Sequence, residues 1–394
     1  METIIKKIVH FIKNNQNISN PFVKFIFNKK YAPIQKIVKI KNIENCEDNI
    51  IKTIFPKNNF LCHLPKFNNN NTATTTIETP AIALFQFENA IIDADSSSVL
   101  YNNKLLVNKY KDERYNEGFV VWHNQENAKI KLNNIEKIEN GFFLGGNGSW
   151  NWYHFLVEIA PKLLLLNIKE TNKLLVSEVV LQYTSMQRII DLLKNDFKII
   201  YLKRHQQYEI GKLFYINDFN HVQFNRFDGK IKSDGTYFNE TLTKEFSEKI
   251  IQSFDMEKPI AENLFLYRKN THRIAKNQDE ILNFLQQYNY SPICLEEMEI
   301  EKQIQYFYHA KNIIGITGAA WTNLVFCRNQ PNAICFIPEN AKTFSVFSNL
   351  AKIFDVNMIS QVYDSQSLHT NSDFTIDFEK FKEIFFTINK RDEH

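Results

Sequence analysis

The sequence predicts an α/β protein with two Rossmann-like domains that face one cleft, preceded by a β-rich lead-in. Three observations support this expectation. The chain has 394 residues, which is too long for one ordinary core. Its 44% hydrophobic and 23% charged residues are typical of a globular protein. From Trp152 onward, short apolar runs alternate with stretches of helical period, as in a parallel sheet covered by helices.

The N-terminal segment is basic and amphipathic. Over residues 1–14, apolar side chains recur at near-helical spacing with lysines among them. Such a helix either packs on its own domain, which the sequence favours, or lies on an anionic membrane surface. The segment has no small-residue cleavage site, so it does not resemble a secretory signal. The sequence contains no run of about 18 apolar residues, which a membrane-spanning helix would need.

The lead-in is expected to contain strands up to about Gly141. The stretch 65–80, PKFNNNNTATTTIETP, is polar and bounded by prolines, so a surface loop is predicted there. ALFQFENAIIDADSSSVLYNNKLLV then has β-branched runs broken by turn-forming residues. Asp93 and Asp95 in it resemble a metal-binding Asp-x-Asp triplet, but their position in a predicted hairpin turn favours a backbone role.

The rest of the first domain is expected to follow an α/β pattern. Phe155, Ile159 and Leu163 lie on one face of a predicted buried helix that opens at Trp152, and LLVSEVVLQ and FKIIYL are predicted strands. The polar, proline-containing segment MEKPIAE near residue 256 indicates a boundary. We therefore expect domains at 1–255 and 256–394.

The second domain repeats the pattern more clearly. Predicted strands are NLFLYR, SPICLE, NIIGI and AICFI, and predicted helices are DEILNFLQQYN, EKQIQYFYHA and a closing DFEKFKEIFFTINK. Ligands of such open sheets bind at the carboxyl ends of the strands.

Two segments at predicted strand ends contain polar groups that suit anion binding. In NIIGITGAAWTNLVF, a strand leads through Gly318 and Ala319 into a helix that begins with Thr322 and Asn323, and free N–H groups at a helix start bind anions. The spacing matches neither a dinucleotide fingerprint nor a Walker loop, and close strand-to-helix packing explains it equally well. In LYRKNTHRIAKN, the residues that suit diphosphate binding are Arg268, Arg273 and Asn277.

Cysteine usage and net charge exclude several classes of protein. The five cysteines are odd in number and lack C-x-x-C spacing, so neither a disulfide framework nor a structural zinc site is indicated, and a reducing cytoplasm is expected. A net charge of +3 is too small to indicate a nucleic-acid partner.

The arrangement resembles glycosyltransferase family 61. The blocks NWYHFLVEIAPKLLLL, LYRKNTHRIAKNQDEIL and EKQIQYFYHAKNIIGITGAAWTNLVF occur in the family's order over about residues 145–340. The sequence departs from the family at Thr317, where the family has a histidine, and at Ala320, where it has a glycine. The family's later glutamate has no counterpart in CFIPEN.

The resemblance implies a GT-B architecture, a nucleotide-sugar donor and inversion at the anomeric carbon. Residues 1–255 would form the acceptor side and 256–394 the nucleotide-sugar side. No metal or other cofactor is expected, and the acceptor would be a glycan or a lipid-linked glycan of a bacterial capsule or lipopolysaccharide. The protein is then expected in the cytoplasm, with the inner membrane as an optional peripheral partner. A catalytically inactive glycan-binding or scaffolding subunit is the alternative, motivated by Thr317. The implied donor-binding residues are Arg268, Arg273, Asn277, Gly318, Ala319, Thr322 and Asn323.

A single displacement needs a base that takes the proton of the acceptor hydroxyl, and histidine suits this near neutral pH. His154 is the first candidate, and Glu158, one helical turn later, either orients the imidazole or is itself the base. The expected acceptor-binding residues are Trp150, Asn151, Trp152 and Tyr153, since aromatic rings stack on sugar faces. A buried structural histidine and core tryptophans are the alternatives.

Overall fold

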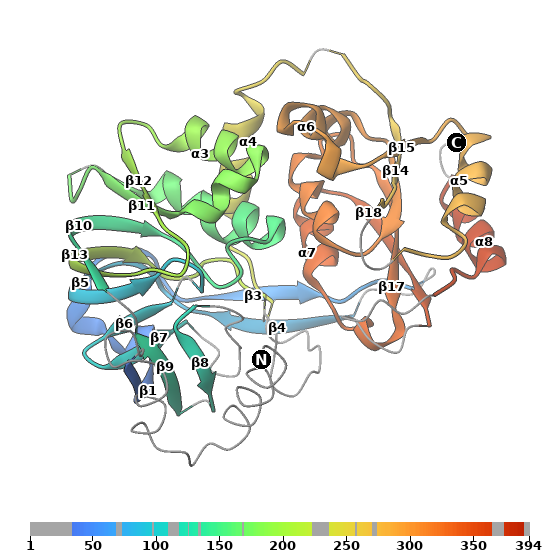
Figure 1. Cartoon of the computed structure of the whole chain (residues 1–394). Helices are drawn as coiled ribbons and strands as arrows, with labels where there is room; N and C mark the ends of the chain where they lie inside the picture. The colour runs from blue at the N-terminus through green and yellow to red at the C-terminus, as the bar shows by residue number, and fades with distance from the viewer. Residues whose placement is uncertain are drawn as a thin grey trace, which may run out of the picture.

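The computed structural model describes residues 34–67, 73–96, 98–108, 118–124, 126–132, 135–167, 169–222, 236–256, 258–269, 274–364 and 374–389. The predicted basic segment 1–14 and Arg273 lie outside these residues. The described chain combines three β-sheets with several helices, which confirms the α/β class (Figure 1).

The largest sheet has eleven strands in the order β12-β11-β10-β13-β5-β6-β7-β1-β9-β8, with β2 paired to β5. The strands β10 to β13 are mutually parallel, whereas β5 runs antiparallel to β13. The lead-in strands therefore continue the same sheet, because β5 and β13 pair over most of their length. The bounds are β1 (Ile34–Asn42), β2 (Ile50–Phe55), β5 (Ile82–Asp93), β6 (Val99–Tyr101), β7 (Lys104–Val107), β8 (Val120–His123), β9 (Asn127–Leu132), β10 (Ile135–Leu144), β11 (Lys173–Ser177), β12 (Lys198–Leu202) and β13 (Gln207–Ile216).

Helical segments cover the parallel end of this sheet (Figure 1). Their buried faces pack on β10, β11 and β13 in one apolar core. The longer ones are α3 (Thr184–Leu193) and α4 (Glu240–Ile251), and the short ones are η3 (His154–Ile159), η4 (Ala160–Leu165) and η5 (Glu178–Gln182). Two further short helices, η1 (Ile43–Asn45) and η2 (Glu47–Asn49), connect β1 to β2.

The second sheet is entirely parallel, with strand order β15-β14-β16-β17-β18. Numbered along the chain this order is 2-1-3-4-5, a doubly wound arrangement. Every strand and helix predicted between 263 and 389 is present, while β18 and α7 were not predicted. The bounds are β14 (Asn263–Leu266), α5 (Gln278–Gln286), β15 (Ser291–Ile293), η7 (Leu295–Glu297), α6 (Ile300–His309), β16 (Asn312–Ile316), η8 (Ala319–Phe326), β17 (Asn332–Pro338), η9 (Glu339–Ala341), α7 (Val346–Ile353), β18 (Asn357–Tyr363) and α8 (Phe378–Asn389).

A two-stranded hairpin of β3 (Asn58–His63) and β4 (Thr74–Thr79) reaches from beneath the large sheet toward the C-terminal sheet (Figure 1). At its far end, the His63 N–H donates to Asn349 Oδ1 of α7 at 2.8 Å and Ser348 Oγ donates to His63 O at 2.7 Å. The surface loop predicted for 65–80 is therefore wrong over β4, because its β-branched threonines favour a strand. We call this hairpin the arm.

The two sheets are joined by more than the arm. Phe155 and Leu156 of the large-sheet side share one apolar core with Trp321 and Leu324 of η8. Ion pairs join Arg188 of α3 to Glu301 of α6 at 3.0 Å and Arg328 to Glu248 of α4 at 2.8 Å.

Candidate active site

The segment that carries His154 is helical, as predicted, but its geometry is not α. The Ala160 N–H donates to Phe155 O, five residues earlier, so η3 is a π-helix, and η4 continues as a 3₁₀-helix. Pro161 has no N–H for the carbonyl of Val157, four residues earlier. Asn220 Nδ2 donates to that carbonyl instead, at 2.8 Å. The proline therefore helps to explain the irregular helix, a form that often occurs at functional sites.

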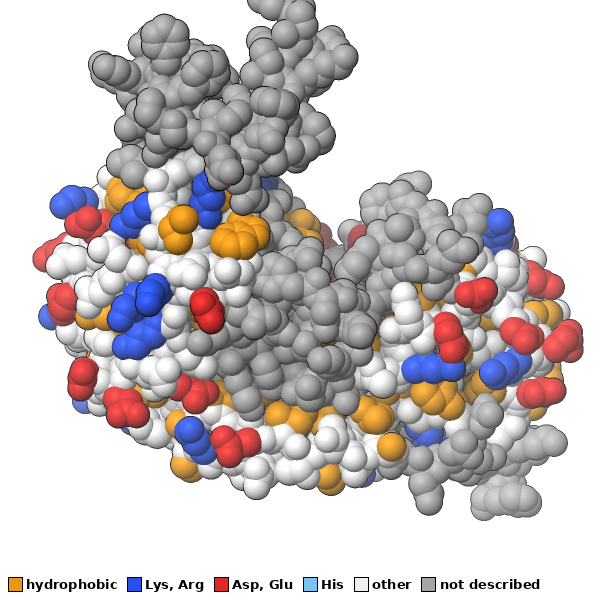
Figure 2. Space-filling model, turned by 90° about the horizontal axis from the view of Figure 1, so that it is seen from below, with side chains coloured by type: hydrophobic (Ala, Val, Ile, Leu, Met, Phe, Trp, Pro, Cys, Tyr) orange, Lys and Arg blue, Asp and Glu red, His pale blue; other side chains and the backbone are white. Residues whose placement is uncertain are grey.

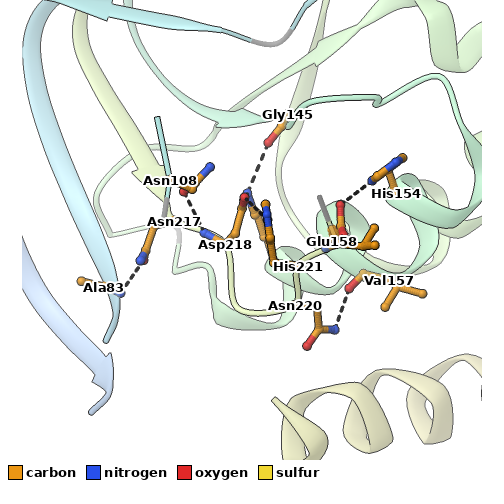
Figure 3. A network of polar contacts seen from close by, with 12 residues as sticks. Ala83, Asn108, Gly145, His154, Val157, Glu158, Asn217, Asp218, Asn220 and His221 are labelled. Carbon is orange, nitrogen blue, oxygen red and sulfur yellow. Dashed lines mark hydrogen bonds and ion pairs between the residues drawn. The ribbon is translucent and has the colours of Figure 1, made fainter. Parts of the chain in front are cut away.

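His154 and Glu158 form a close buried pair on η3 (Figure 3). Imidazole Nδ1 lies 2.6 Å from Glu158 Oε2, and both side chains are less than a tenth exposed. The Val222 N–H donates to the other carboxylate oxygen, Glu158 Oε1, at 3.0 Å. Burial raises the pKa of Glu158, and the neighbouring His154 opposes that rise only in part. The structure thus brings together the two residues that the sequence predicted as the proton-transfer pair.

A second charged group lies beside this pair. The Lys162 ammonium is fully buried, 3.4 Å from Asp218 Oδ1, 3.3 Å from Gly145 O and 5.0 Å from the centre of the Tyr215 ring. Burial alone would lower the pKa of Lys162, but Tyr215 and Asp218 outweigh it and the pKa is raised. Burial likewise opposes ionisation of Asp218, yet Lys162 and His221 hold its pKa below the ordinary value. His221 Nδ1 lies 3.4 Å from Asp218 Oδ2.

The glycine-rich loop before η3 covers the imidazole. Gly148 has a φ of +78°, and a Cβ at this position would lie 2.7 Å from His154 Cδ2. Lys162 holds the start of the loop through Gly145 O. Under the loop lies a cavity of about 30 Å³ that His154, Glu158, Asp218 and His221 line together, which is room for about one water molecule.

Part of the predicted donor side lies close together in the structure. Arg268, two residues after the end of β14, donates from Nη2 to Thr317 O at 2.7 Å, and Thr317 directly follows β16. A Cβ on Gly318 would lie only 2.0 Å from Arg268 Nη2, so the close approach requires glycine. The structure therefore brings Arg268, Thr317, Gly318 and the half-buried Ala319 to one edge of the parallel sheet.

Thr322 and Asn323 do not face solvent at the start of η8. Both are fully buried, and among the described residues Thr322 Oγ1 has no hydrogen-bond partner. Asn323 Oδ1 accepts a hydrogen bond from Trp152 Nε1 at 2.8 Å, and Asn323 Nδ2 donates to Gln303 Oε1 at 2.9 Å. A residue predicted for the donor and one predicted for the acceptor are thus joined to each other.

The other predicted ligand-binding side chains are engaged in local structure. Asn277 donates from Nδ2 to Ile376 O at 2.9 Å and accepts from the Ile376 N–H at 3.0 Å. Asn151 Oδ1 accepts from the Tyr153 N–H at 2.9 Å. Tyr153 is buried, and its hydroxyl has no hydrogen-bond partner within the described chain. Trp150 is half-buried, so ligand binding by these residues stays a prediction.

The Asp93-Ala94-Asp95 triplet forms the turn after β5, as predicted. Asp93 Oδ1 accepts from the N–H groups of Asp95 at 3.0 Å and Ser96 at 2.9 Å, and burial raises the pKa of Asp93. Asp95 binds Arg204 Nε at 3.1 Å and the His205 N–H at 2.6 Å. Both carboxylates therefore hold the hairpin together. Within the described ranges, no three His, Cys, Asp or Glu residues are arranged to hold a metal ion.

Lys162, Asp218 and His221 were not predicted from the sequence. Lys162 had a signal, since it is a cation inside the apolar run APKLLLL and a buried cation needs a partner. Asp218 and His221 follow the end of β13, but no pattern links them to Lys162, because 56 positions separate Lys162 from Asp218.

The comparisons with known proteins agree with the motifs. No curated protein matches the chain. In the part of the chain that the structure describes, no helix is both long and apolar enough to cross a membrane. The family model described as Glycosyltransferase 61 matches residues 152–334, a range that begins two residues before His154 and includes Arg268 and Gly318. Residues 152–334 thus match glycosyltransferase family 61, and this family indicates a glycosyltransferase.

Proposed function

We propose that this protein is an inverting glycosyltransferase that moves a sugar from a nucleotide-sugar donor to a hydroxyl of a glycan or lipid-linked glycan. The observation that carries the proposal is the 2.6 Å contact between His154 Nδ1 and Glu158 Oε2 beside a small polar cavity, inside the region that matches the family. A carboxylate at Nδ1 favours the tautomer with its proton there, which leaves Nε2 as the basic nitrogen.

The reaction then needs one displacement. His154 Nε2 takes the proton of the acceptor hydroxyl as its oxygen attacks the anomeric carbon, and the bond from that carbon to the diphosphate oxygen breaks with its electron pair on the leaving group. Glu158 stabilises the imidazolium that forms, as the carboxylate of a catalytic triad does. Nucleoside diphosphate and a glycosylated acceptor of inverted configuration are the products.

The leaving diphosphate needs positive charge or N–H donors. Arg268 and the backbone at Gly318 and Ala319 suit this role, since they lie at the carboxyl ends of β14 and β16, where ligands of parallel sheets bind. Arg273 is proposed from the sequence alone. We propose that no metal takes part, because the Asp93 and Asp95 carboxylates are engaged in the turn.

We also propose a GT-B arrangement, with an acceptor-side domain up to about residue 255 and a nucleotide-sugar domain from 256. The doubly wound order of the second sheet and the gap in secondary structure between α4 and β14 support this division. Assembly of a bacterial capsule or lipopolysaccharide in the cytoplasm, at or near the inner membrane, is proposed from the family resemblance.

The test is release of nucleoside diphosphate from a panel of nucleotide sugars, with and without glycan acceptors. An active enzyme releases it slowly with water and faster with its acceptor, and His154→Asn abolishes the acceptor-dependent part. His205→Asn is the matched control, since that imidazole is largely exposed. If no donor is turned over while glycans still bind, the protein is a non-catalytic glycan-binding subunit, the alternative that Thr317 suggests.

A further inference from the structure

The end of the large sheet formed by β1, β9 and β8 exposes an unusual surface. Val38, Ile40, Ala128 and Ile130 point into a small apolar core on one side. Because side chains alternate along a strand, their neighbours point to the opposite side. We call this opposite side the outer face, and it consists of Ile37, Lys39, Val121, Trp122, Lys129 and Lys131.

The strand register places apolar and cationic residues of the outer face next to each other. Lys129 of β9 is paired with Ile37 of β1 on one side and with Trp122 of β8 on the other. A register shift between Val120 and Trp122 leaves Val121 exposed as well. The side chains are 72% exposed at Ile37, 54% at Val121 and 45% at Trp122. Three large apolar side chains are therefore in water around a lysine.

The lysines of this surface have no counter-charge in the described chain. Lys39, Lys129 and Lys131, and Lys104 of β7, form no ion pair with a described residue. Lys39 and Lys104 are direct neighbours across β1 and β7. Like charges at such positions are destabilising unless an anion lies near them. Figure 2 shows Lys or Arg side chains next to hydrophobic ones on the face seen from below.

We propose that the outer face docks on the surface of a membrane that contains anionic lipids. Lysines near such a surface are attracted to its negative potential, and tryptophan partitions to the level of the headgroups. A soluble polyanion would account for the lysines but not for three exposed apolar side chains beside them. The combination of charge and apolar surface is what binds a protein to a bilayer interface.

The position of the outer face adds a consequence that rests on the proposed function. Ile43, just after β1, and Leu106 and Val107 of β7 line the cavity that His154 and Glu158 share. The docking strand β1 therefore leads directly into this lining, and its neighbour β7 contributes to it. Docking would place that site close to a lipid-linked acceptor, while the membrane contact itself does not depend on any enzymatic activity.

The first test is co-sedimentation of the full chain with vesicles of phosphatidylcholine, with and without phosphatidylglycerol. We expect binding only to the anionic vesicles. The triple variant Lys39→Glu, Lys129→Glu and Lys131→Glu should bind about 100-fold more weakly, since each lysine near the surface contributes roughly fivefold. The matched control reverses three other exposed lysines (Lys244→Glu, Lys258→Glu and Lys302→Glu) and should bind as the unmodified chain does.

The second test asks whether the apolar side chains enter the interface. Bromine-labelled acyl chains should quench tryptophan emission in the bound protein, and Trp122→Phe should remove the quenching while binding persists. Ile37→Ser should weaken binding about tenfold. Ile260→Ser, at another exposed isoleucine, should not change it.

Three results would overturn the proposal. One is equal loss of binding in the two triple-lysine variants, which would reflect net charge alone. Another is quenching that survives in Trp122→Phe. The third is retention on dextran sulfate without binding to anionic vesicles, which would identify a soluble polyanion as the partner. Folding of each variant is checked by its thermal unfolding midpoint, so that loss of structure is not mistaken for loss of docking.

Discussion

Trp152 and Asn323 are joined by a 2.8 Å hydrogen bond across 171 positions of sequence, from the indole N–H to the amide oxygen. Trp152 lies two residues before His154, and Asn323 lies on η8, the helix that follows Gly318. The bond therefore connects the segment that carries the proposed base to the segment proposed to bind diphosphate. Asn323 in turn donates to Gln303 of α6, so its position is fixed from both sides.

Removal of this indole N–H should destabilise the protein. Trp152→Phe leaves the fully buried Asn323 Oδ1 without its donor, and an unsatisfied buried acceptor costs about 1–3 kcal/mol of unfolding free energy. Urea denaturation measures this loss. Trp122→Phe is the matched control and should lie within about 0.5 kcal/mol of the unmodified protein, because Trp122 is exposed.

His154→Asn should strongly lower kcat without unfolding the protein. General-base catalysis contributes about 100-fold to 10,000-fold, so kcat should fall by that order while donor affinity, measured by calorimetry, barely moves. Glu158→Gln should lose less, since it keeps a hydrogen-bond acceptor at Nδ1 but not the charge that stabilises imidazolium. A larger loss in Glu158→Gln than in His154→Asn would instead assign the base role to the carboxylate.

The stability contribution of Asp218 should depend on pH in a defined direction. Lys162 and His221 hold its folded pKa below 3.8, so its stabilisation is fully present above about pH 3.8 and is lost as the pH falls through the folded pKa. Asp218→Asn should therefore cost about 3–5 kcal/mol at pH 6, because Lys162 is left buried without its anion.

That difference should shrink as the pH falls below about 3.8, because Asp218 of the unfolded unmodified protein then takes up a proton. Urea unfolding at pH 6 and at pH 3 measures the gap in unfolding free energy between the variant and the unmodified protein at each pH. Asp191→Asn, at an exposed ion pair, should show almost no gap at either pH. An Asp218→Asn gap that stayed constant with pH would contradict the charged pair.

Gly318→Ala should disturb the position of Arg268. A Cβ at residue 318 would lie 2.0 Å from Arg268 Nη2, so the guanidinium must move away from Thr317 O. Arg268→Ala should weaken nucleoside-diphosphate binding roughly 10-fold to 150-fold, since it removes a charge-assisted contact of about 1.5–3 kcal/mol.

If Gly318→Ala acts through Arg268, the double variant should bind nucleoside diphosphate no more weakly than Arg268→Ala alone. Arg188→Ala, which removes an exposed ion pair and a cation–π contact with Phe254, is the calorimetric control. Independent, additive losses would show that the two residues act at separate places.

Turnover should survive an excess of metal chelator. The Asp93 and Asp95 carboxylates accept backbone hydrogen bonds in the turn after β5, so Asp95→Asn should lower stability while kcat is retained. Asp93→Asn tests the same point at the more buried carboxylate. Loss of turnover on chelation, restored by manganese or magnesium, would show that the reaction depends on a metal.

The C-terminal sheet could be predicted strand by strand because its strands are apolar and separated by helices of clear period. β18 was not predicted because its sequence NMISQVY contains polar residues among the apolar ones. One of these polar residues, Gln361, is nevertheless buried. β4 was mistaken for a loop because its threonines follow an asparagine run. In each case, pairing with another strand determined the structure, and a local sequence pattern does not reveal which strand that is.

In the candidate site, too, local features could be predicted from the sequence and long-range contacts could not. The His154–Glu158 pair was predictable because a separation of four residues on one helix brings side chains together. The π-helical geometry was not, since it depends on Asn220, 63 positions from Val157. The pairing of Trp152 with Asn323 was equally out of reach, because both had been interpreted as ligand-binding residues exposed at a cleft.

The arm has a consequence for how the chain is made. Its docking residue His63 and its partner Asn349 are 286 positions apart, so the hairpin leaves the ribosome long before α7 exists. At about 5–20 residues per second, that interval lasts roughly 15 to 60 s. During this interval, the side chains of Phe60 and Cys62, which are buried in the folded protein, lack part of their final contacts. The apolar face of the arm therefore stays exposed for much of synthesis, and a chaperone would protect it during that time.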